Sequence, residues 1–208
     1  IQGIILNQVT EKTTHSMRER IERECGVPVL GYVPFRKNSS LESRHLGLKM
    51  PAEIEHIQED LTELGKELEK TIQFDRMIQI GMKAEVLSWN PIAVKPLTHP
   101  LSLSVAKDEA FCFLYQENID FLNQIGVTIQ YFSPLHDNEL PKGTQAILLP
   151  GGYPELYAKE LEKNEQMRNE IANLIQQGIP VIAECGGYLY LGKQLVDSLG
   201  ESYQMVGA

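Results

Sequence analysis

The sequence predicts an α/β protein whose strands form a mostly parallel sheet. Residues 3–34 read as a short apolar strand, an amphipathic helix and a second strand with short connections, which is the pattern of a parallel βαβ unit. In the second half, four nearly continuous apolar runs are separated by helices or loops. Such runs are typical of strands that are buried on both faces of a parallel sheet.

The first half contains a second helical pattern after the βαβ unit. From residue 52 to 72 apolar residues recur every three or four positions, which predicts an amphipathic surface helix. Asp75 is expected to cap a shorter helix that runs through Met82. The expected elements of this half are strands at 3–7 and 27–34 and helices at 14–25, 52–72 and 75–82.

Residues 84–100 hold three prolines and show no clear period. They are expected to link a first domain, 1–83, to a second, 101–208. The expected elements of the second domain are strands at 101–107, 127–132, 146–150 and 179–184 and helices at 117–126 and 165–177. Gly178 is expected to end the last of these helices.

The composition narrows the functional classes. The net charge of −9, without any block of Lys and Arg, argues against nucleic acid as a partner. No apolar window is long enough to span a membrane. Three scattered cysteines form neither a disulfide framework nor a CxxC metal pair, so no metal ligand is assigned and a cytoplasmic location is expected. The chain begins without Met and in the middle of a strand, so we expect a piece of something longer.

Three short segments follow predicted strands in the second half: KDEAF (107–111), PGGYPE (150–155) and ECGGY (184–188). The carboxyl ends of parallel strands lie along one edge of the sheet, where functional residues gather. We therefore expect these three segments to converge on one site.

Cys185 ends a strand and is followed by two glycines, an arrangement similar to the G-x-S-x-G nucleophile elbow with Ala183 at the first glycine position. A helix expected to begin near Tyr188 would point its N-terminus at the sulfur and favour the thiolate. Backbone N–H groups of Gly186 and of the Gly151–Gly152 turn could hold an oxyanion. By itself the thiol fits a small buried hydrophobe equally well, and the neighbouring PGGYPE segment favours the nucleophile.

The other chemically active residues carry weaker signals. None of the five histidines follows Cys185; His136 stays open as a base, although a solvated loop histidine beside Asp137 fits it better. Cys25 and Cys112 are expected to pack among apolar neighbours. Arg44 and His45 could hold an anionic group, or could belong to a loop that packs through its leucines.

Five segments together resemble the cobyrinic acid a,c-diamide synthase family. They occur in the family's order through both halves of the chain. The segments are GYVPFRKNSSLESRHLGL, AKDEAFCFLYQENIDFL, FSPLHDNELP, LPGGYPELYAKELEKNEQMR and PVIAECGGYLYLG. The resemblance implies the C-terminal part of a P-loop domain of the dethiobiotin synthetase type, followed by a flavodoxin-like class I glutamine amidotransferase domain. It implies a ligase that amidates the a and c acetates of a corrin with ATP, Mg²⁺ and ammonia from glutamine.

The resemblance also assigns roles to residues of this sequence. Cys185 matches the nucleophile, and Gly152 and Gly186 match positions suited to the oxyanion hole. The expected substrate-binding residues are Arg44, His45, Asp108 and Glu109. The family's catalytic His is expected beyond residue 208, and no GxxxxGK[ST] phosphate loop occurs here, so ATP and Mg²⁺ would bind mainly outside this chain. The chain alone is therefore expected to be inactive, with glutamine, ATP and a corrin tetrapyrrole as small-molecule partners of the longer enzyme.

Several alternatives stay open. A sister a,c-diamide synthase that acts on hydrogenobyrinic acid or nickel-sirohydrochlorin would carry the same motifs, and cobyric acid synthase shares the architecture. From another class, a redox sensor or a small hydrolase could use the same cysteine elbow. A scaffolding domain with an inert thiol is the plainest alternative. The sequence leaves open whether the chain is a monomer or a homodimer.

Overall fold

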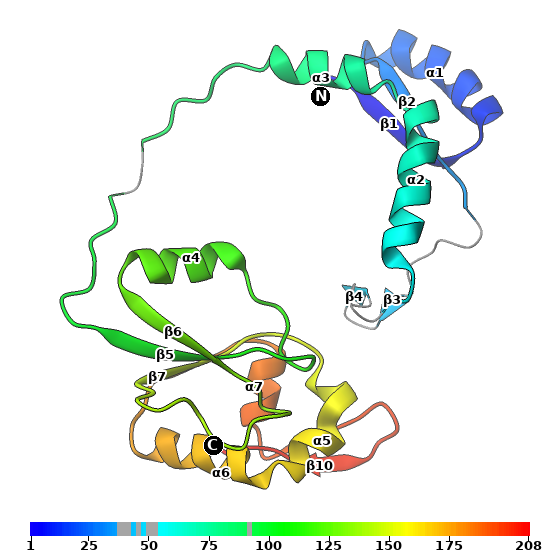
Figure 1. Cartoon of the computed structure of the whole chain (residues 1–208). Coiled ribbons are helices and arrows are strands. Elements are labelled where there is room, and N and C mark those ends of the chain that lie inside the picture. Colours follow the sequence, from blue (N-terminus) through cyan, green and yellow to red (C-terminus); the bar gives the residue numbers. More distant parts are fainter. Residues whose placement is uncertain (37–42, 45–46, 49–53, 91–92) are drawn as a thin grey trace. The chain divides into compact units, whose positions relative to one another are not determined.

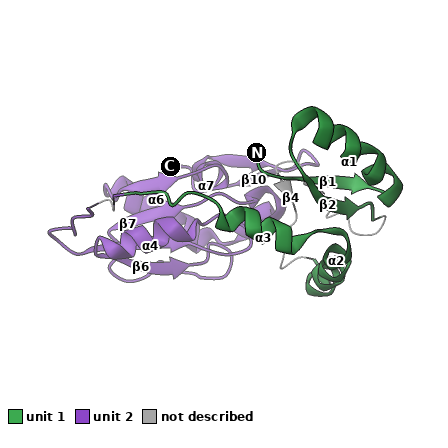
Figure 2. Cartoon of the chain, turned by 90° about the horizontal axis from the view of Figure 1, so that it is seen from above, with its two compact units in different colours: residues 1–89 green, residues 90–208 purple. Residues whose placement is uncertain are grey.

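The computed structural model describes residues 1–36, 43–44, 47–48, 54–90 and 93–208 (Figure 1). The chain divides into two compact units, residues 1–89 and 90–208 (Figure 2). The boundary falls inside the proline-containing segment 84–100, whose described residues form no helix or strand.

Unit 1 is built around the predicted βαβ element. Strands β1 and β2 pair in parallel, as the sequence predicted, and α1 connects them. The Thr10 side chain accepts a hydrogen bond from the N–H of Thr13 at the start of α1, and Gly26 ends the helix at φ 64°. The elements are β1 (Ile4–Val9), α1 (Glu11–Cys25), β2 (Val29–Pro34), β3 (Ser43–Arg44), β4 (Gly47–Leu48), α2 (Ile57–Thr71) and α3 (Phe74–Met82).

The C-terminal end of α2 docks closely on β2. Gly31 is required there because its φ is 144° and because a Cβ would collide with the carbonyl oxygen of Thr71. The N–H of Gln73 then donates to the carbonyl of Leu30 at 2.7 Å. Helix α2 begins at Ile57, later than the expected residue 52; residues 51–53 lie outside the described part of the chain.

Unit 2 contains a four-stranded sheet in which every neighbouring pair is parallel. The strand order is β6-β5-β7-β8, which matches the first four positions of the flavodoxin-like order. The elements are β5 (Leu101–Ala106), α4 (Gln116–Gln124), β6 (Val127–Phe132), β7 (Ala146–Leu149), the 3₁₀ helix η2 (Pro154–Tyr157), α5 (Ala158–Lys163), α6 (Glu165–Gln176), β8 (Val181–Ala183), α7 (Gly186–Leu191), β9 (Gln194–Val196) and β10 (Ser202–Gln204).

Alternate residues of the sheet belong to two hydrophobic clusters. On one face Leu103 and Val105 pack with residues of α4 and the turn after it, including Leu122. On the other face Ile147 and Leu149 pack with α5, α6 and α7. Because strand side chains alternate between faces, the sheet lies between helical layers, with α4 on one side and α6 on the other (Figure 1).

Some elements differ from the sequence-based expectations. Helix α7 begins at Gly186, two residues before the expected start at Tyr188. Helix propensity disfavours two glycines in a first turn. Gly186 and Gly187 are both needed here, because a Cβ on either would collide with neighbouring residues. The η2–α5 segment and the β9–β10 hairpin were not predicted, because each is short and lacks a clear hydrophobic period. Among the described residues, no helix combines the length and the apolar character needed to cross a membrane.

Candidate functional site

Cys185 sits at a sharp turn between β8 and α7. Its backbone has φ 45° and ψ −109°, a combination that residues with a side chain rarely adopt, and the residue is exposed. Such strain costs on the order of 1–3 kcal/mol and persists where the surrounding structure enforces it. The turn therefore has the geometry of a nucleophile elbow, which presents the thiol at the carboxyl edge of the sheet.

The glycines around Cys185 permit very close backbone approaches. A Cβ on Gly186 would stand 2.7 Å from the Cδ of Pro154 and 3.1 Å from the backbone nitrogen of Gly152. A Cβ on Gly187 would collide with the carbonyl oxygen of Leu149, and one on Gly152 with that of Ala110. These approaches hold the three strand-end segments together, as their positions at the ends of parallel strands predicted.

Two backbone N–H groups lie beside this turn without partners. Within the described part of the chain, neither Gly152 nor Gly186 donates a backbone hydrogen bond. Both residues are buried, and their backbones adjoin each other. Unpaired N–H groups beside a nucleophile are the donors that an oxyanion hole requires, so the arrangement can stabilise a tetrahedral intermediate on the sulfur.

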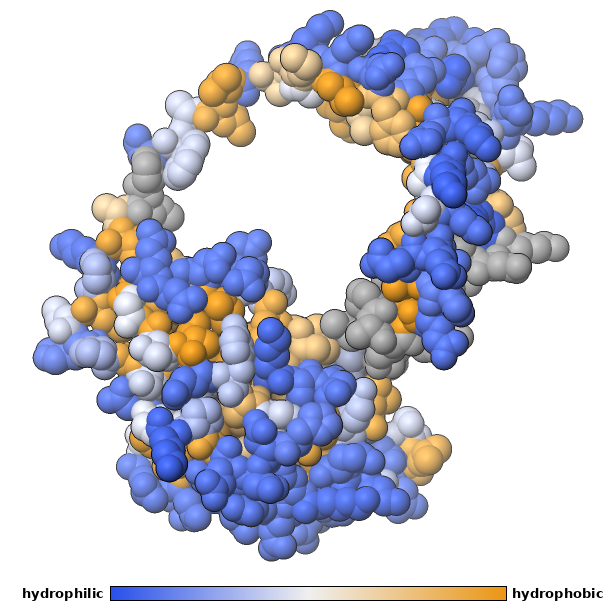
Figure 3. Space-filling view, viewed as in Figure 1, coloured by the Kyte–Doolittle hydropathy of each residue, from blue (hydrophilic) through white to orange (hydrophobic). Residues whose placement is uncertain are grey.

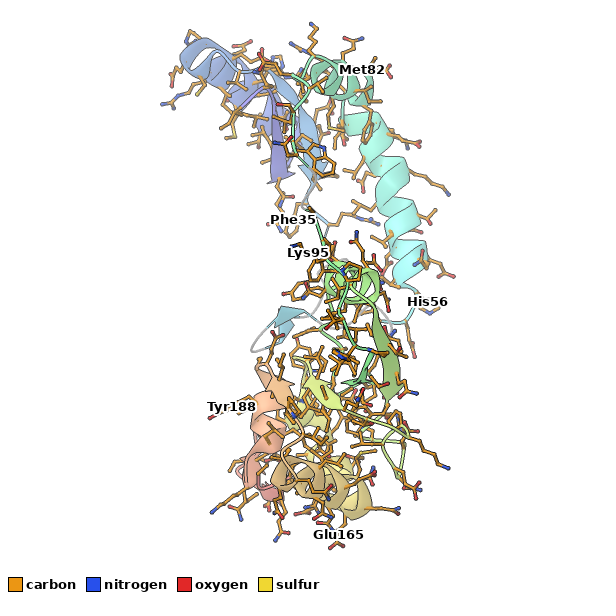
Figure 4. The ribbon with its side chains drawn as sticks, turned by 90° about the vertical axis from the view of Figure 1, so that its left-hand side faces the viewer. Phe35, His56, Met82, Lys95, Glu165 and Tyr188 are labelled. Carbon is orange, nitrogen blue, oxygen red and sulfur yellow. The ribbon has the colours of Figure 1, made fainter. Side chains whose placement is uncertain are left out.

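An aromatic residue that the sequence reasoning missed packs against Gly151, which also lies beside Cys185. The position of a Cβ on Gly151 lies 3.6 Å from the Cβ of Cys185 and 3.1 Å from the Cδ2 of Phe113. The N–H of Phe113 donates to the carbonyl of Gly151 at 3.0 Å, and its ring meets that of Tyr153 edge-on at 5.2 Å. The alternation in FCF, with Phe111 buried and Phe113 at the surface, is the signal that could have identified it. Tyr188 of α7 points away from its helix and is exposed (Figure 4).

Asp108 connects two loops beneath this edge. Its carboxylate accepts hydrogen bonds from the N–H groups of Ala110 and Phe111 at 2.9 and 3.1 Å. It also accepts from the hydroxyl of Ser133 at 2.8 Å and the N–H of Leu135 at 3.0 Å. The four bonds join the loop after β5 to the loop after β6, so the structure gives Asp108 a positioning role. Substrate binding by Asp108 stays a prediction.

Glu109 and His136 form an exposed pair on the same two loops. The Nε2 of His136 is 2.9 Å from the Oε2 of Glu109. The pKa of Glu109 lies below its ordinary value, first because its own backbone donates a hydrogen bond and then because His136 does. The pKa of His136 is raised chiefly by the hydrogen bond to Glu109. The imidazole is exposed and engaged with a carboxylate, and its role as a base or as a solvated loop histidine stays a prediction.

The other expected site residues are placed as follows. Arg44 lies in the short strand β3, and His45 lies outside the described residues. The expectation that Cys25 packs among apolar neighbours is wrong, because Cys25 at the end of α1 is exposed. Cys112 is half-buried.

The described residues contain no preformed cluster of metal ligands. Among them no group of three His, Cys, Asp or Glu side chains is arranged to hold a metal ion. The sequence also lacks the GxxxxGK[ST] loop that cradles phosphates.

The flavodoxin-like sheet and the strained cysteine turn define unit 2 as an α/β domain of the glutamine amidotransferase type. The chain belongs to the family described as the CobB/CobQ-like glutamine amidotransferase domain, which matches residues 102–208.

The chain is also similar to curated relatives over nearly all of its length. It is 39% identical to a protein of Streptococcus sanguinis over 208 residues, covering 100% of this chain and 45% of that protein. It is 41% identical to a protein of Salmonella typhimurium over 212 residues, which cover 99% of this chain and 45% of that protein. Both relatives are named cobyrinate a,c-diamide synthase, and this chain spans less than half of their length. One solved structure, described as a putative peptidase E protein from Listeria monocytogenes, is 13% identical to this chain with a TM-score of 0.41. The match covers 51% of this chain and 61% of that one.

Proposed function

We propose that Cys185 is the nucleophile that releases ammonia from glutamine. The observation that carries this proposal is the left-handed backbone of Cys185 beside the unpartnered N–H groups of Gly152 and Gly186. A strained, exposed thiol next to two free donors suits attack on a carbonyl carbon. Membership in the amidotransferase family supports glutamine as the source of that carbonyl.

In the proposed reaction the thiolate of Cys185 attacks the side-chain amide carbon of glutamine. The carbonyl oxygen becomes an oxyanion that the N–H groups of Gly152 and Gly186 can stabilise. The C–N bond then breaks, and ammonia leaves once its nitrogen has gained a proton. Water attacks the resulting thioester, which releases glutamate and regenerates the thiol. The ring of Phe113, which packs against Gly151, is proposed to contact the methylene groups of the substrate.

For the longer protein we propose the amidation of the a and c acetate carboxylates of a corrin with this ammonia. The names of the relatives support this assignment. A carboxylate resists attack by ammonia until its oxygen becomes a leaving group, so ATP and Mg²⁺ are proposed as co-reactants of the part of the enzyme that lies outside this chain. The cytoplasm is the proposed location.

The test uses the complete gene product with glutamine, MgATP and cobyrinic acid. The mass of the corrinoid is measured by mass spectrometry, and glutamate, the product of glutamine hydrolysis, is measured separately. The wild type is expected to amidate cobyrinic acid twice with glutamine as the nitrogen source. The Cys185→Ala variant is expected to catalyse both amidations only when free ammonia is supplied. Cys25→Ala is the matched control, since it removes an exposed thiol of unit 1 and is expected to leave both readouts unchanged.

The two readouts separate the parts of the proposal. Glutamine hydrolysis without a change in the mass of the corrinoid would support Cys185 as the nucleophile and would show that cobyrinic acid is not the substrate. Hydrogenobyrinic acid and nickel-sirohydrochlorin would then be tested as substrates. If Cys185→Ala hydrolyses glutamine as fast as the wild type, the thiol is not the nucleophile, and a sensor or an inert role replaces the proposal.

A further inference from the structure

Unit 1 contains an open pocket that the proposed glutamine chemistry does not use. Its volume is about 950 Å³, and α1, β2 and the C-terminal end of α2 line it. Hydrophilic side chains cover the visible faces of both helices (Figure 3). The pocket is lined by three cationic side chains, Lys12 and Arg18 of α1 and Lys70 of α2, and by the carboxylates Glu11 and Glu67.

The side chain of Arg18 lines this pocket and contains a buried donor. Its Nε is shielded from solvent and has no hydrogen-bond partner among the described residues. No ion pair or hydrogen bond involves its guanidinium within the part of the chain that the structure describes. A buried donor without a partner is costly, and native structures commonly satisfy such groups with water or with an ion.

The charges around Arg18 favour an anion. Neither Lys12 nor Lys70 has an ion pair among the described residues. Of the two lining carboxylates, Glu67 is already engaged, since its Oε2 lies 3.4 Å from the Nε of Arg36. Among the described residues, three cations without an ion pair and one such carboxylate, Glu11, therefore line the pocket, in a chain whose net charge is −9.

We propose that this pocket binds an oxyanion group, a phosphate or a carboxylate, with Arg18 as its principal ligand. A guanidinium presents N–H groups in a fixed fork that matches both groups, and Lys12 and Lys70 add point charges. The hydroxyl of the half-buried Tyr32 is a further donor in the lining. The pocket lies within unit 1, so a test of anion binding there does not depend on the proposed thiol chemistry of unit 2.

The experiment is a titration of the ¹⁵N-labelled 208-residue chain, followed by the NMR shifts of its backbone amides. Inorganic phosphate and tricarballylate are the two probes, each added at constant ionic strength. The proposal expects saturable shifts at residues 11–18 and 70–73. Because a charge-assisted hydrogen bond contributes roughly 1.5–3 kcal/mol, Arg18→Met should weaken binding about tenfold or more.

Arg20→Met is the matched control. It removes the same charge from the same helix, but Arg20 is exposed and pairs with Glu24 at 3.2 Å. Two positions correspond to roughly 200° of rotation around a helix, so Arg20 is not on the pocket side. This variant should bind like the wild type. If Arg18→Met does not fold, Lys70→Gln replaces it, with an expected weakening of about threefold.

The two probes distinguish the sources of the anion. Saturation by phosphate alone supports a phosphate ester, saturation by tricarballylate alone supports a polycarboxylate, and saturation by both supports a general oxyanion site. Shifts that do not saturate, or that are equal in Arg18→Met and Arg20→Met, would overturn the proposal and leave water as the partner of Arg18.

Discussion

The backbone nitrogen of Gly152 lies 3.1 Å from the point where a Cβ on Gly186 would stand. The two residues are far apart in the sequence, and each follows a different strand. Their contact brings both unpaired N–H groups to the same side of the sheet as Cys185. Any side chain at residue 186 would enter the space that these groups share.

Replacing Gly186 with Ala is therefore expected to damage the site. The added Cβ would meet the Cδ of Pro154 at 2.7 Å and the carbonyl oxygen of Gly152 at 2.9 Å, so the elbow must shift. Overpacking of this kind costs about 1–3 kcal/mol. Urea denaturation measures the loss, and glutamine hydrolysis by the longer protein should fall with it.

Gly65→Ala is the control for that substitution. Gly65 lies within α2 and has open space around it, so Ala should stabilise the helix by roughly 0.5–1 kcal/mol. Equal effects of the two substitutions on stability would contradict the close packing at residue 186.

Cys185→Gly is expected to stabilise unit 2 while it abolishes reactivity at this position. Glycine adopts φ 45° without the strain that a side chain causes, and the gain should be about 1 kcal/mol. Cys185→Ala removes the same thiol but keeps the Cβ, so it should lack this gain. Chemical denaturation of both variants makes the comparison, and identical stabilities would show that the turn is not strained.

Asp108→Ala is expected to destabilise unit 2 by about 2–3 kcal/mol, because it leaves three N–H groups and one hydroxyl without their acceptor. The matched control is Asp120→Ala in α4, whose exposed carboxylate accepts, among the residues that the structure describes, only from the side chain of Gln116 at 2.8 Å. That change should cost less than about 0.5 kcal/mol. Thermal unfolding measures both variants, and a small effect at Asp108 would contradict its role in joining the loops.

The pair of Glu109 and His136 predicts a pH window. The raised pKa of His136 contributes stability that is present below its ordinary value of 6.5 and is lost as the pH rises through the folded value. The lowered pKa of Glu109 contributes stability that is present above 4.5 and is lost as the pH falls through its folded value. The pair therefore contributes most between pH 4.5 and 6.5.

An NMR titration of the His136 ring tests this coupling. Its midpoint should lie above 6.5 in the wild type and should fall in Glu109→Gln, which keeps the size of the side chain but removes its charge. A His136 midpoint that does not respond to Glu109→Gln would rule out the pairing in solution.

Local patterns in the sequence did not predict the exposure of β8, in which Ile182 is 63% exposed. They were sufficient to predict most helices and strands, the parallel pairing of β1 with β2, and the thiol at the end of a strand. These features depend on hydrophobic period and on turn residues, which act over a few neighbouring positions. The start of α7 was misplaced because its two glycines are selected by contact with Leu149, Gly152 and Pro154 and not by helix propensity.

Only the tertiary structure decided which residues meet around Cys185. The order β6-β5-β7-β8 places the turn after β7 beside the turn after β8, and so brings Gly152 to Gly186 and Phe113 to Gly151. It likewise makes Asp108, which the sequence suggested only as a substrate-binding residue, the acceptor for residues 25 and 27 positions away. Strand order results from how whole helices and strands pack, and no local stretch of sequence encodes it.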